Sequence, residues 1–158
     1  MQIREVTYDD ISKWLSLAHE YDKYVKELVP DLIEWYNGSQ TSISFENYMN
    51  AKILQHEAFI VTCKNNQDCF GITAISIKNN RITFFGISHN CDFMKIGEQL
   101  LSYSLNLLNS NADIFVNIIK SKEKQIQKQY ELFDKFGFLY YSDGLENGVP
   151  VNIMIKKS

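Results

Sequence analysis

The most informative chemistry in this sequence lies between residues 81 and 101. This run reads as a strand over 82–88, a short loop, and a helix that begins at Lys95. Phosphates are often held where a strand passes through a short loop into a helix, because free backbone N–H groups and the positive end of the helix dipole meet there. The composition is unusual for a phosphate cradle, since the loop carries an acid, Asp92, and its only glycine, Gly97, comes at the end.

Two reactive side chains fall in the same loop. His89 is a candidate general base, because imidazole titrates near neutrality, and the alternative is an exposed loop histidine. Cys91 is two residues away and could be a nucleophile if the imidazole lay beside it, which sequence adjacency does not establish. Together with Cys63 and Cys69 the cysteines are odd in number, and they lack metal-ligand spacing with the histidines. We therefore predict reduced thiols and no metal site.

The elements that must position these residues alternate between strands and helices. The first predicted helix is capped by Thr7 and runs to Val25, and the others cover 45–53, 95–109 and 121–136. Pro30 either stops the first helix or starts a short helical piece that runs to Trp35. The predicted strands cover 3–6, 58–63, 69–77, 82–88, 112–118, 138–142 and 151–155. Gly137 is expected to end the last helix, and 143–150 to form a loop between the last two strands.

This order of elements defines an expected fold class. Short polar connections among the three strands from 58 to 88 favour an antiparallel meander. The later strands alternate with helices, which indicates a mixed, mostly antiparallel sheet covered by helices on both faces. We predict an α/β (α+β) fold in a single domain over residues 1–158.

Composition excludes several classes of function. Of the 158 residues, 45% are hydrophobic and 22% are charged, which is typical of a globular protein. The net charge of −3, without a basic cluster, argues against nucleic-acid binding. No apolar run approaches the roughly 20 residues that a membrane span needs, and the N-terminus lacks the pattern of a signal segment. We therefore expect a cytoplasmic protein that binds neither nucleic acid nor membrane.

Three local runs, taken with the order of elements, resemble one family. The first is Ile3-Arg4-x-Val6-Thr7-x-x-Asp10, the second is the strand–loop–helix over 82–101, and the third is the run from Leu132 to Phe138, similar to an L-Y-x-x-x-G-F ending. Together they resemble the GNAT superfamily of acyl-CoA-dependent N-acetyltransferases, and the resemblance covers essentially the whole chain.

The resemblance implies a binding mode for acetyl-CoA as co-substrate. Acyl-CoA would wedge between two central strands that splay apart, here the strands that end at Ser88 and near Asn117, and the following loop would wrap the pyrophosphate. The residues that the resemblance assigns to acyl-CoA are Ile87, Ser88, His89, Phe93, Met94, Lys95, Ile96, Gly97, Glu98 and Asn117.

The loop departs from the family pattern Q/R-x-x-G-x-G/A, of which only Gly97 is retained. Asp92 stands where a residue that favours anions is usual, and Lys95 replaces a glycine. A carboxylate near a diphosphate is unfavourable by roughly 1–4 kcal/mol for each charge pair. The Lys95 ammonium could offset this cost, or Asp92 could cap the helix instead.

The expected catalytic groups depart further. Many family members use a tyrosine acid at the position of Phe133, and a glutamate on the strand that here covers 82–86 and has no acid. Tyr130 lies one helical turn before Phe133 and is a candidate substitute, with core packing as the alternative. The predicted catalytic residues are therefore His89 and Tyr130.

The resemblance places much of the acceptor site between Tyr21 and Ser44. Acids among aromatic rings in this segment suit a cationic amine, and the alternative is a solvated acidic face with the rings in the core. The predicted substrate-binding residues are Asp31, Glu34 and Trp35. Asp143 and Glu146, in the late loop, could close the same pocket.

Two functions follow as hypotheses. The first is an N-acetyltransferase that moves an acetyl group from acetyl-CoA to an amine of a small molecule or peptide, with diverged catalytic residues. The second is an inactive module of the same fold that binds CoA, another small ligand or a protein partner. Family members often dimerise, so a homodimer is possible.

Overall fold

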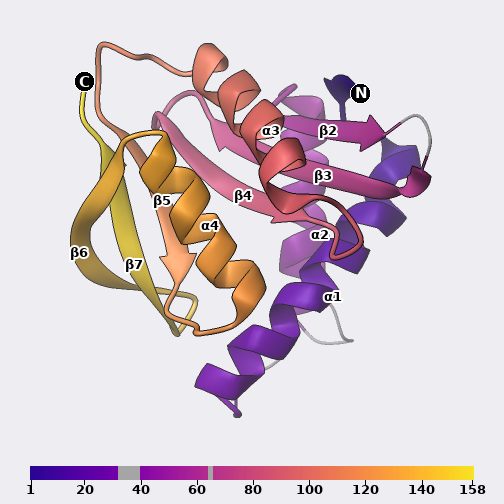
Figure 1. Ribbon diagram of the computed structural model, residues 1–158. Coiled ribbons are helices and arrows are strands. Elements are labelled where there is room, and N and C mark those ends of the chain that lie inside the picture. The colour runs from indigo at the N-terminus through magenta and orange to yellow at the C-terminus, as the bar shows by residue number, and fades with distance from the viewer. Residues whose placement is uncertain (32–39, 64–65) are drawn as a thin grey trace.

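The computed structural model describes residues 1–31, 40–63 and 66–158 (Figure 1). The strands are β1 (Gln2–Glu5), β2 (Ala58–Cys63), β3 (Asn66–Ser76), β4 (Arg81–Ile87), β5 (Ile114–Ile119), β6 (Phe138–Glu146) and β7 (Val149–Lys156). The helices are α1 (Ile11–Leu28), which follows a 3-10 turn at Tyr8–Asp10, α2 (Gln40–Leu54), α3 (Phe93–Leu107) and α4 (Lys124–Lys135). The predicted helical piece near Pro30 falls largely outside the described residues.

In the described residues, seven strands form one sheet in the order β1-β2-β3-β4-β5-β7-β6. Neighbouring strands pair antiparallel, except that β4 and β5 are parallel. Figure 1 shows α3 and α4 on one face of the sheet and α1 and α2 on the other. The predicted mixed, mostly antiparallel sheet with helices on both faces is therefore confirmed.

The pairing of β4 with β5 is short, and it ends where β4 bulges. Only Arg81 and Ile82 pair with β5, opposite Phe115 and Val116. The register of β4 against β3 shifts directly afterwards, so that Thr83 has no partner across the ladder. A bulge bends its strand and increases the local twist. Beyond it, β4 and β5 diverge, as Figure 1 shows, and this is the splay that the resemblance implied.

Two apolar cores follow from the two layers of helices. The core under α3 and α4 includes Leu100 and Phe133, and the core under α1 and α2 includes Trp14 and Met49; all four side chains are 0% exposed. These are the stripes that the 3.6-residue periodicity predicts. Phe133, which the resemblance aligns with a tyrosine of many family members, packs edge-on against the rings of Phe85 and Phe138.

The structure differs from the predicted element boundaries at the last two strands and at the third helix. The last two strands are longer than predicted and meet in a two-residue turn, Asn147-Gly148, where both residues have positive φ. This is the geometry of a type I′ hairpin, so the predicted loop over 143–150 is wrong. The third helix begins earlier than predicted, because Asp92 is its N-cap and accepts a hydrogen bond of 3.2 Å from the Lys95 N–H. Gly137 ends α4 with φ +90°, as expected.

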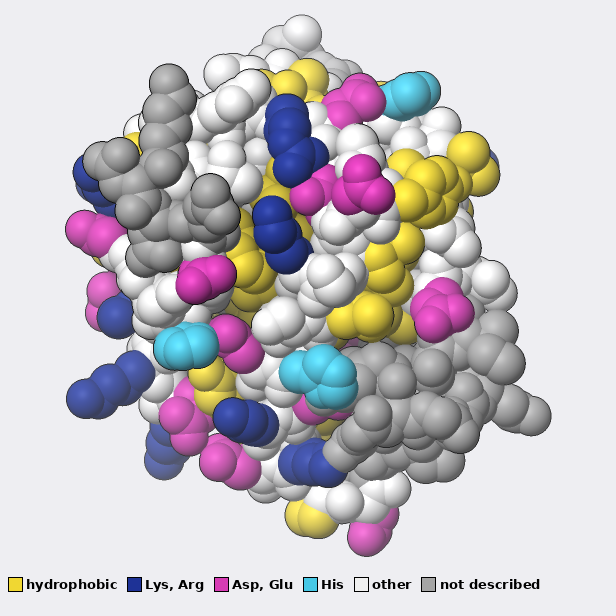
Figure 2. All heavy atoms as spheres, turned by 90° about the vertical axis from the view of Figure 1, so that its right-hand side faces the viewer, with side chains coloured by type: hydrophobic (Ala, Val, Ile, Leu, Met, Phe, Trp, Pro, Cys, Tyr) yellow, Lys and Arg dark blue, Asp and Glu magenta, His cyan; other side chains and the backbone are white. Residues whose placement is uncertain are grey.

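The surface carries both signs of charge. On the face in Figure 2, acidic and basic side chains are interspersed and no large patch of one sign is visible. Within the described part of the chain, no helix is both long and apolar enough to cross a membrane.

Candidate functional site

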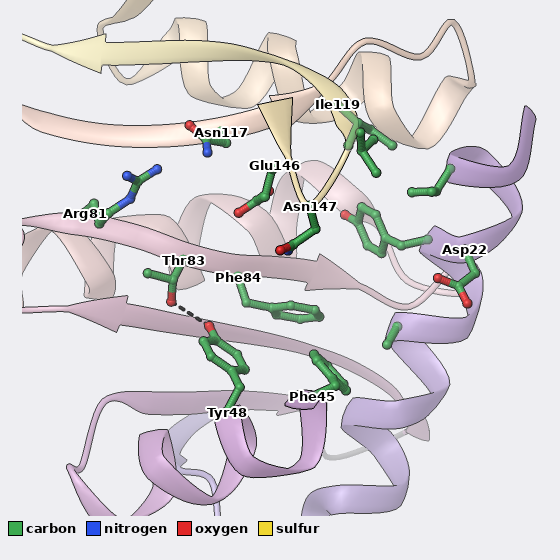
Figure 3. A pocket seen from close by; sticks show the side chains of 14 residues that line it. Asp22, Phe45, Tyr48, Arg81, Thr83, Phe84, Asn117, Ile119, Glu146 and Asn147 are labelled. Atoms are coloured by element: carbon green, nitrogen blue, oxygen red, sulfur yellow. Dashed lines mark hydrogen bonds between the residues drawn. The ribbon is translucent and has the colours of Figure 1, made fainter. Parts of the chain in front are cut away.

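A cavity of about 530 Å³ opens where β4 and β5 diverge (Figure 3). It lies between these strands, helices α1 and α2, and the β6–β7 hairpin. Its lining is mainly apolar and aromatic, with a few charged and polar side chains. The residues that line it are Ala18, Tyr21, Asp22, Val25, Phe45, Tyr48, Arg81, Thr83, Phe84, Asn117, Ile119, Glu146, Asn147 and Val149.

A narrower slot of about 110 Å³ lies between β4 and β5 themselves. It is lined along β4 by residues 82–85 and along β5 by residues 116–119. The slot and the larger cavity share residues, among them Thr83, Asn117 and Glu146. The two spaces therefore adjoin at these side chains, and a molecule in the slot would lie next to a molecule in the cavity there.

Glu146 enters the cavity from the end of β6. The Asn147-Gly148 turn follows it directly, and its partner across the hairpin, Val149, is buried. Figure 3 shows Glu146 in the middle of the cavity, with Arg81 and Asn117 on one side and Asp22 on the other.

The environment of Glu146 alters its proton affinity. Burial raises the pKa of Glu146, while the positive charge of Arg81 and hydrogen bonding from Asn117 act against that rise. In the described residues, the Oδ1 atom of Asn117 is buried without a hydrogen-bond partner. This atom is an acceptor that remains for a ligand.

Helices α1 and α2 form the other walls of the cavity. Asp22 on α1 is only 7% exposed and faces the cavity. Tyr48 on α2 shares a hydrogen bond of 2.6 Å with the Thr83 hydroxyl, at the β4 bulge. Burial raises the pKa of Tyr48 and also that of Tyr21, so both phenols stay protonated. The cavity therefore combines aromatic walls with two carboxyl groups.

The slot itself is partly spanned by two side chains. The Phe85 carbonyl accepts a hydrogen bond of 2.9 Å from the Tyr21 hydroxyl and another of 3.0 Å from Gln129 on α4. Phe85 lies past the last residue of β4 that pairs with β5. These two donors therefore take the place of a neighbouring strand.

The predicted acyl-CoA residues of the β4–α3 loop lie next to one another, at the end of β4. Ile87 and Ser88 are buried, and the Ser88 hydroxyl accepts a hydrogen bond of 3.2 Å from the Phe70 N–H. His89 points outward: its side chain is 76% exposed, and its Nδ1 atom lies 2.8 Å from a carboxylate oxygen of Glu20. His89 does not line either cavity, so its predicted role as a base receives no support from the geometry.

The cysteines differ from the prediction. A disulfide joins Cys69 in β3 to Cys91 in the β4–α3 loop, with 5.2 Å between their Cα atoms, while Cys63 is free. The prediction that all three are reduced thiols is therefore wrong for this structure. The bridge ties the loop to the sheet beside Ser88, and it removes Cys91 as a free nucleophile.

The predicted acyl-CoA residues at the start of α3 divide into buried and exposed positions. Phe93 and Ile96 are buried in the core, and Met94 packs against it. Lys95 is exposed, and Glu98 pairs with Lys135 on α4. Gly97 is buried between helices: a Cβ atom there would lie 2.7 Å from Leu132 Cδ2 and 3.1 Å from Ile87 Cδ1. The glycine therefore serves helix packing, and the assignment of this segment to acyl-CoA stays a prediction.

Tyr130 lies on α4, outside the lining of both cavities. Its hydroxyl donates to the backbone carbonyls of Ile118 and Ile119, at 3.1 and 2.8 Å, and accepts a hydrogen bond from Asn152. Burial raises the pKa of Tyr130. The hydroxyl proton is thus already shared with β5, and a catalytic role for Tyr130 stays a prediction without support from its position.

The predicted substrate residues lie only partly in the described chain. Asp31 is exposed in the turn after α1, and Glu34 and Trp35 lie outside the described residues. Sequence reasoning missed Asp22 and Arg81, both of which line the cavity. Asp22 carried a signal, because it follows Trp14 and Ala18 at helical spacing and so places an acid on the apolar stripe of α1.

Solved structures of acetyltransferases share this fold over the whole chain. The PaiA N-acetyltransferase from Thermoplasma acidophilum, solved in complex with coenzyme A, has a TM-score of 0.67 at 16% identity, over 99% of this chain and 98% of that one. An N-acetyltransferase from Staphylococcus aureus Mu50 has a TM-score of 0.65 at 13% identity, over 98% of this chain and 100% of that one.

A GNAT-family acetyltransferase from Streptococcus agalactiae 2603 also has a TM-score of 0.65 at 13% identity, over 99% of this chain and 95% of that one. No protein-family model matches the sequence, and the comparison with curated proteins finds no match. The fold is that of the GNAT acetyltransferases, as the sequence predicted, at low sequence identity.

Proposed function

We propose that this protein is an acyl-CoA-dependent N-acyltransferase, which moves an acetyl group from acetyl-CoA to an amine of a small molecule or peptide. The observation that carries the proposal is the junction of two spaces at Thr83, Asn117 and Glu146. One space is a narrow slot between diverging strands, and the other is a wider cavity with acids and aromatic rings. Two substrates that must exchange a group need such a meeting point.

The slot fits the extended arm of acyl-CoA. Beyond Ile82, the slot edges of β4 and β5 lack each other as partners, so an extended chain with amide groups can pair there as an added strand would. The buried Oδ1 atom of Asn117 is an acceptor for an N–H group of that arm. Residues 87–89 would hold the part of the arm farther from the acyl group and the start of α3 would hold the pyrophosphate, so that the acyl end reaches the junction of the slot and the cavity. Acetyl-CoA would supply an activated acyl carbonyl.

The cavity suits an amine as acceptor. Asp22 and Glu146 offer carboxylates to a cationic nitrogen, and the rings of Phe45, Tyr48 and Phe84 offer an apolar and cation–π surface to the rest of the molecule. Arg81, at the other side of the cavity, adds a positive group that would favour an acceptor with an anionic or polar end.

The first experiment is a calorimetric titration of the protein with acetyl-CoA, with CoA and ATP as controls. We expect micromolar binding that CoA shares and ATP does not, and a loss of affinity in Asn117→Ala. The matched control is Asn106→Ala, an exposed asparagine on α3. Absence of both heat and thermal shift at millimolar acetyl-CoA would overturn the proposal.

A second candidate function is a binding module without turnover. It is favoured by Phe133 in place of the family's acid, and by the Phe85 carbonyl that Tyr21 and Gln129 already occupy. Release of the CoA thiol on addition of amines separates the two functions. Saturable acetyl-CoA binding, without thiol release for any amine in a panel of aromatic, polyamine and peptide acceptors, would identify the module.

A further inference from the structure

Transfer of an acyl group to an amine requires a residue that takes a proton from the amine. Many GNAT proteins carry a glutamate on the strand that corresponds to β4. At neutral pH an amine is mostly protonated, and an ammonium nitrogen has no lone pair with which to attack a carbonyl. Strand β4, Arg81–Ile87, contains no carboxylate. Among the described residues, the acids that line the cavity or the slot are Asp22 and Glu146.

The two acids are not equivalent in position. Asp22 lines only the larger cavity, whereas Glu146 lines both the cavity and the slot. The bond between the acyl group and the acceptor must form where the two spaces meet, since the acyl end comes from the slot and the amine from the cavity. Glu146 is the acid at that junction.

The fold holds Glu146 in place from a rigid element. It is the last residue of β6, and it pairs with Val149 across a two-residue turn whose positive φ values match the Asn147-Gly148 sequence. Asn117 on β5 lines the same two spaces as Glu146 and is near enough to lower the pKa of its carboxyl group. A side chain at a hairpin end with a partner on the neighbouring strand keeps one orientation better than one on a long loop.

We propose that Glu146 is the proton acceptor for the amine in acyl transfer; this inference rests on the proposed function. The ammonium group gives one proton to the Glu146 carboxylate and becomes a neutral amine. The nitrogen then forms the C–N bond as the C–S bond of the thioester breaks. The second nitrogen proton passes to the departing thiolate, which leaves as the CoA thiol, and Glu146 returns its proton to water. These reaction steps need no tyrosine as an acid, which agrees with the presence of a buried phenylalanine ring at position 133.

The surroundings of Glu146 suit this role. Burial raises the pKa of its carboxyl group, which makes the carboxylate a stronger base than an exposed one. Arg81 on β4 lowers that pKa and so keeps a charged fraction available. The other titratable groups that face the cavity are Asp22 and Tyr21 on α1 and Tyr48 on α2. Of these, Asp22 is expected to attract the ammonium group rather than to take its proton, because it lies away from the slot.

The test compares Glu146→Gln, Glu146→Asp and Asp143→Asn. Glutamine keeps the size of the side chain but cannot take a proton, and aspartate keeps the charge on a shorter side chain. Asp143 is the matched control. The sequence predicted that it closes the pocket with Glu146, but in the structure it is exposed on the same strand, pairs with Lys120 and lines neither space. Thiol release is measured against pH for the best amine, together with the Kd for acetyl-CoA and the thermal midpoint of each variant.

We expect kcat of Glu146→Gln to fall about 100-fold or more, with partial recovery at high pH, where the amine loses its proton to water. Glu146→Asp should retain an intermediate rate, Asp143→Asn should match the wild type, and the Kd for acetyl-CoA should change less than twofold. Wild-type turnover with kcat of Glu146→Gln within threefold, or with an unchanged pH profile, would overturn this inference alone. Failure of the wild type to bind acetyl-CoA would overturn both the proposed function and the role of Glu146. Binding without thiol release would also overturn both, and would identify the protein as a binding module.

Discussion

The side-chain amide of Gln129 donates a hydrogen bond of 3.0 Å to the backbone carbonyl of Phe85, at the point where β4 has lost β5 as its partner. An amide of the acyl-CoA arm would need this same carbonyl. Gln129→Leu removes one of the two donors that compete for this carbonyl, the other being Tyr21, and should tighten acetyl-CoA binding by roughly fivefold, the equivalent of about 1 kcal/mol. Calorimetry with Gln99→Leu, an exposed glutamine on α3, as the control measures the change. Weaker binding in Gln129→Leu would instead make Gln129 a ligand of acyl-CoA.

Asp92 gives a second prediction about the same co-substrate. Its carboxylate caps α3 at the place where the resemblance puts the pyrophosphate, so it would repel a pyrophosphate bound there. Asp92→Asn keeps a good N-cap but removes the charge. Acetyl-CoA should bind roughly three- to tenfold tighter at low salt, and the difference should shrink as salt screens the charges. Asp134→Asn, an exposed acid on α4, should show no change, and a salt-independent effect would rule out this electrostatic explanation.

The order of elements could be predicted because each one follows a local rule. The stripe of Trp14 and Ala18 marks a helix, and alternation around Ile72 marks a strand. The β6–β7 hairpin could also have been predicted from a local rule, the one for two-residue turns. Asn147-Gly148 is a strong type I′ signal, and reading it would have extended both strands and placed Glu146 at a strand end.

Other features depend on contacts between distant residues, which periodicity does not contain. The Cys69–Cys91 bridge arises because β3 and β4 pair in a register that brings Gly71 opposite Ile87, close to both cysteines. The bulge at Thr83 is likewise a property of two strands together. The candidate site was therefore predicted at its strand–loop–helix but not across the cavity, where Arg81 and Glu146 come together from separate parts of the chain.

Gly97 gives a third prediction, which separates packing from phosphate binding. A methyl group at this position would meet Leu132 at 2.7 Å, so Gly97→Ala should destabilise the protein by about 1–3 kcal/mol through overpacking. Adding Leu132→Ala makes room for that methyl group, so the double variant should be more stable than the sum of the two single changes predicts. Urea denaturation measures both effects. Ser102→Ala, exposed on the same helix, is the control, and strict additivity would contradict the packing explanation.

The disulfide gives a fourth prediction. The bridged cysteines are 22 residues apart, and closing a loop of that length in the unfolded chain stabilises the folded state by roughly 3 kcal/mol. Reductant should therefore lower the thermal midpoint by roughly 5–10 °C. The same drop is expected in Cys69→Ser with Cys91→Ser, which should then be insensitive to reductant. Cys63→Ser should behave as the wild type does, and a midpoint unaffected by reductant would show that the bridge contributes no stability.

Asp10 links the N-terminal strand to the first helix, and its stability contribution depends on pH. The Arg4 guanidinium, bound through two hydrogen bonds of 2.7 and 2.8 Å, lowers the pKa of Asp10 against the opposing effect of burial, and the Thr7 N–H lowers it further. Because the folded pKa lies below the unfolded one, the stabilisation is complete above the unfolded value near 4 and is lost as pH falls through the folded value. Asp10→Asn should cost roughly 1–3 kcal/mol at pH 7 and much less at an acid pH below the folded pKa of Asp10.

The measurement for Asp10 is urea denaturation of both proteins at the two pH values. Asp9→Asn is the matched control, because Asp9 is the exposed neighbour in the same turn and should give no pH-dependent difference. A cost of equal size at both pH values would mean that Asp10 stabilises the turn by its shape and neutral hydrogen bonds. In that case the charge on Arg4 would contribute little to the free energy of unfolding, although Asp10 is only 2% exposed.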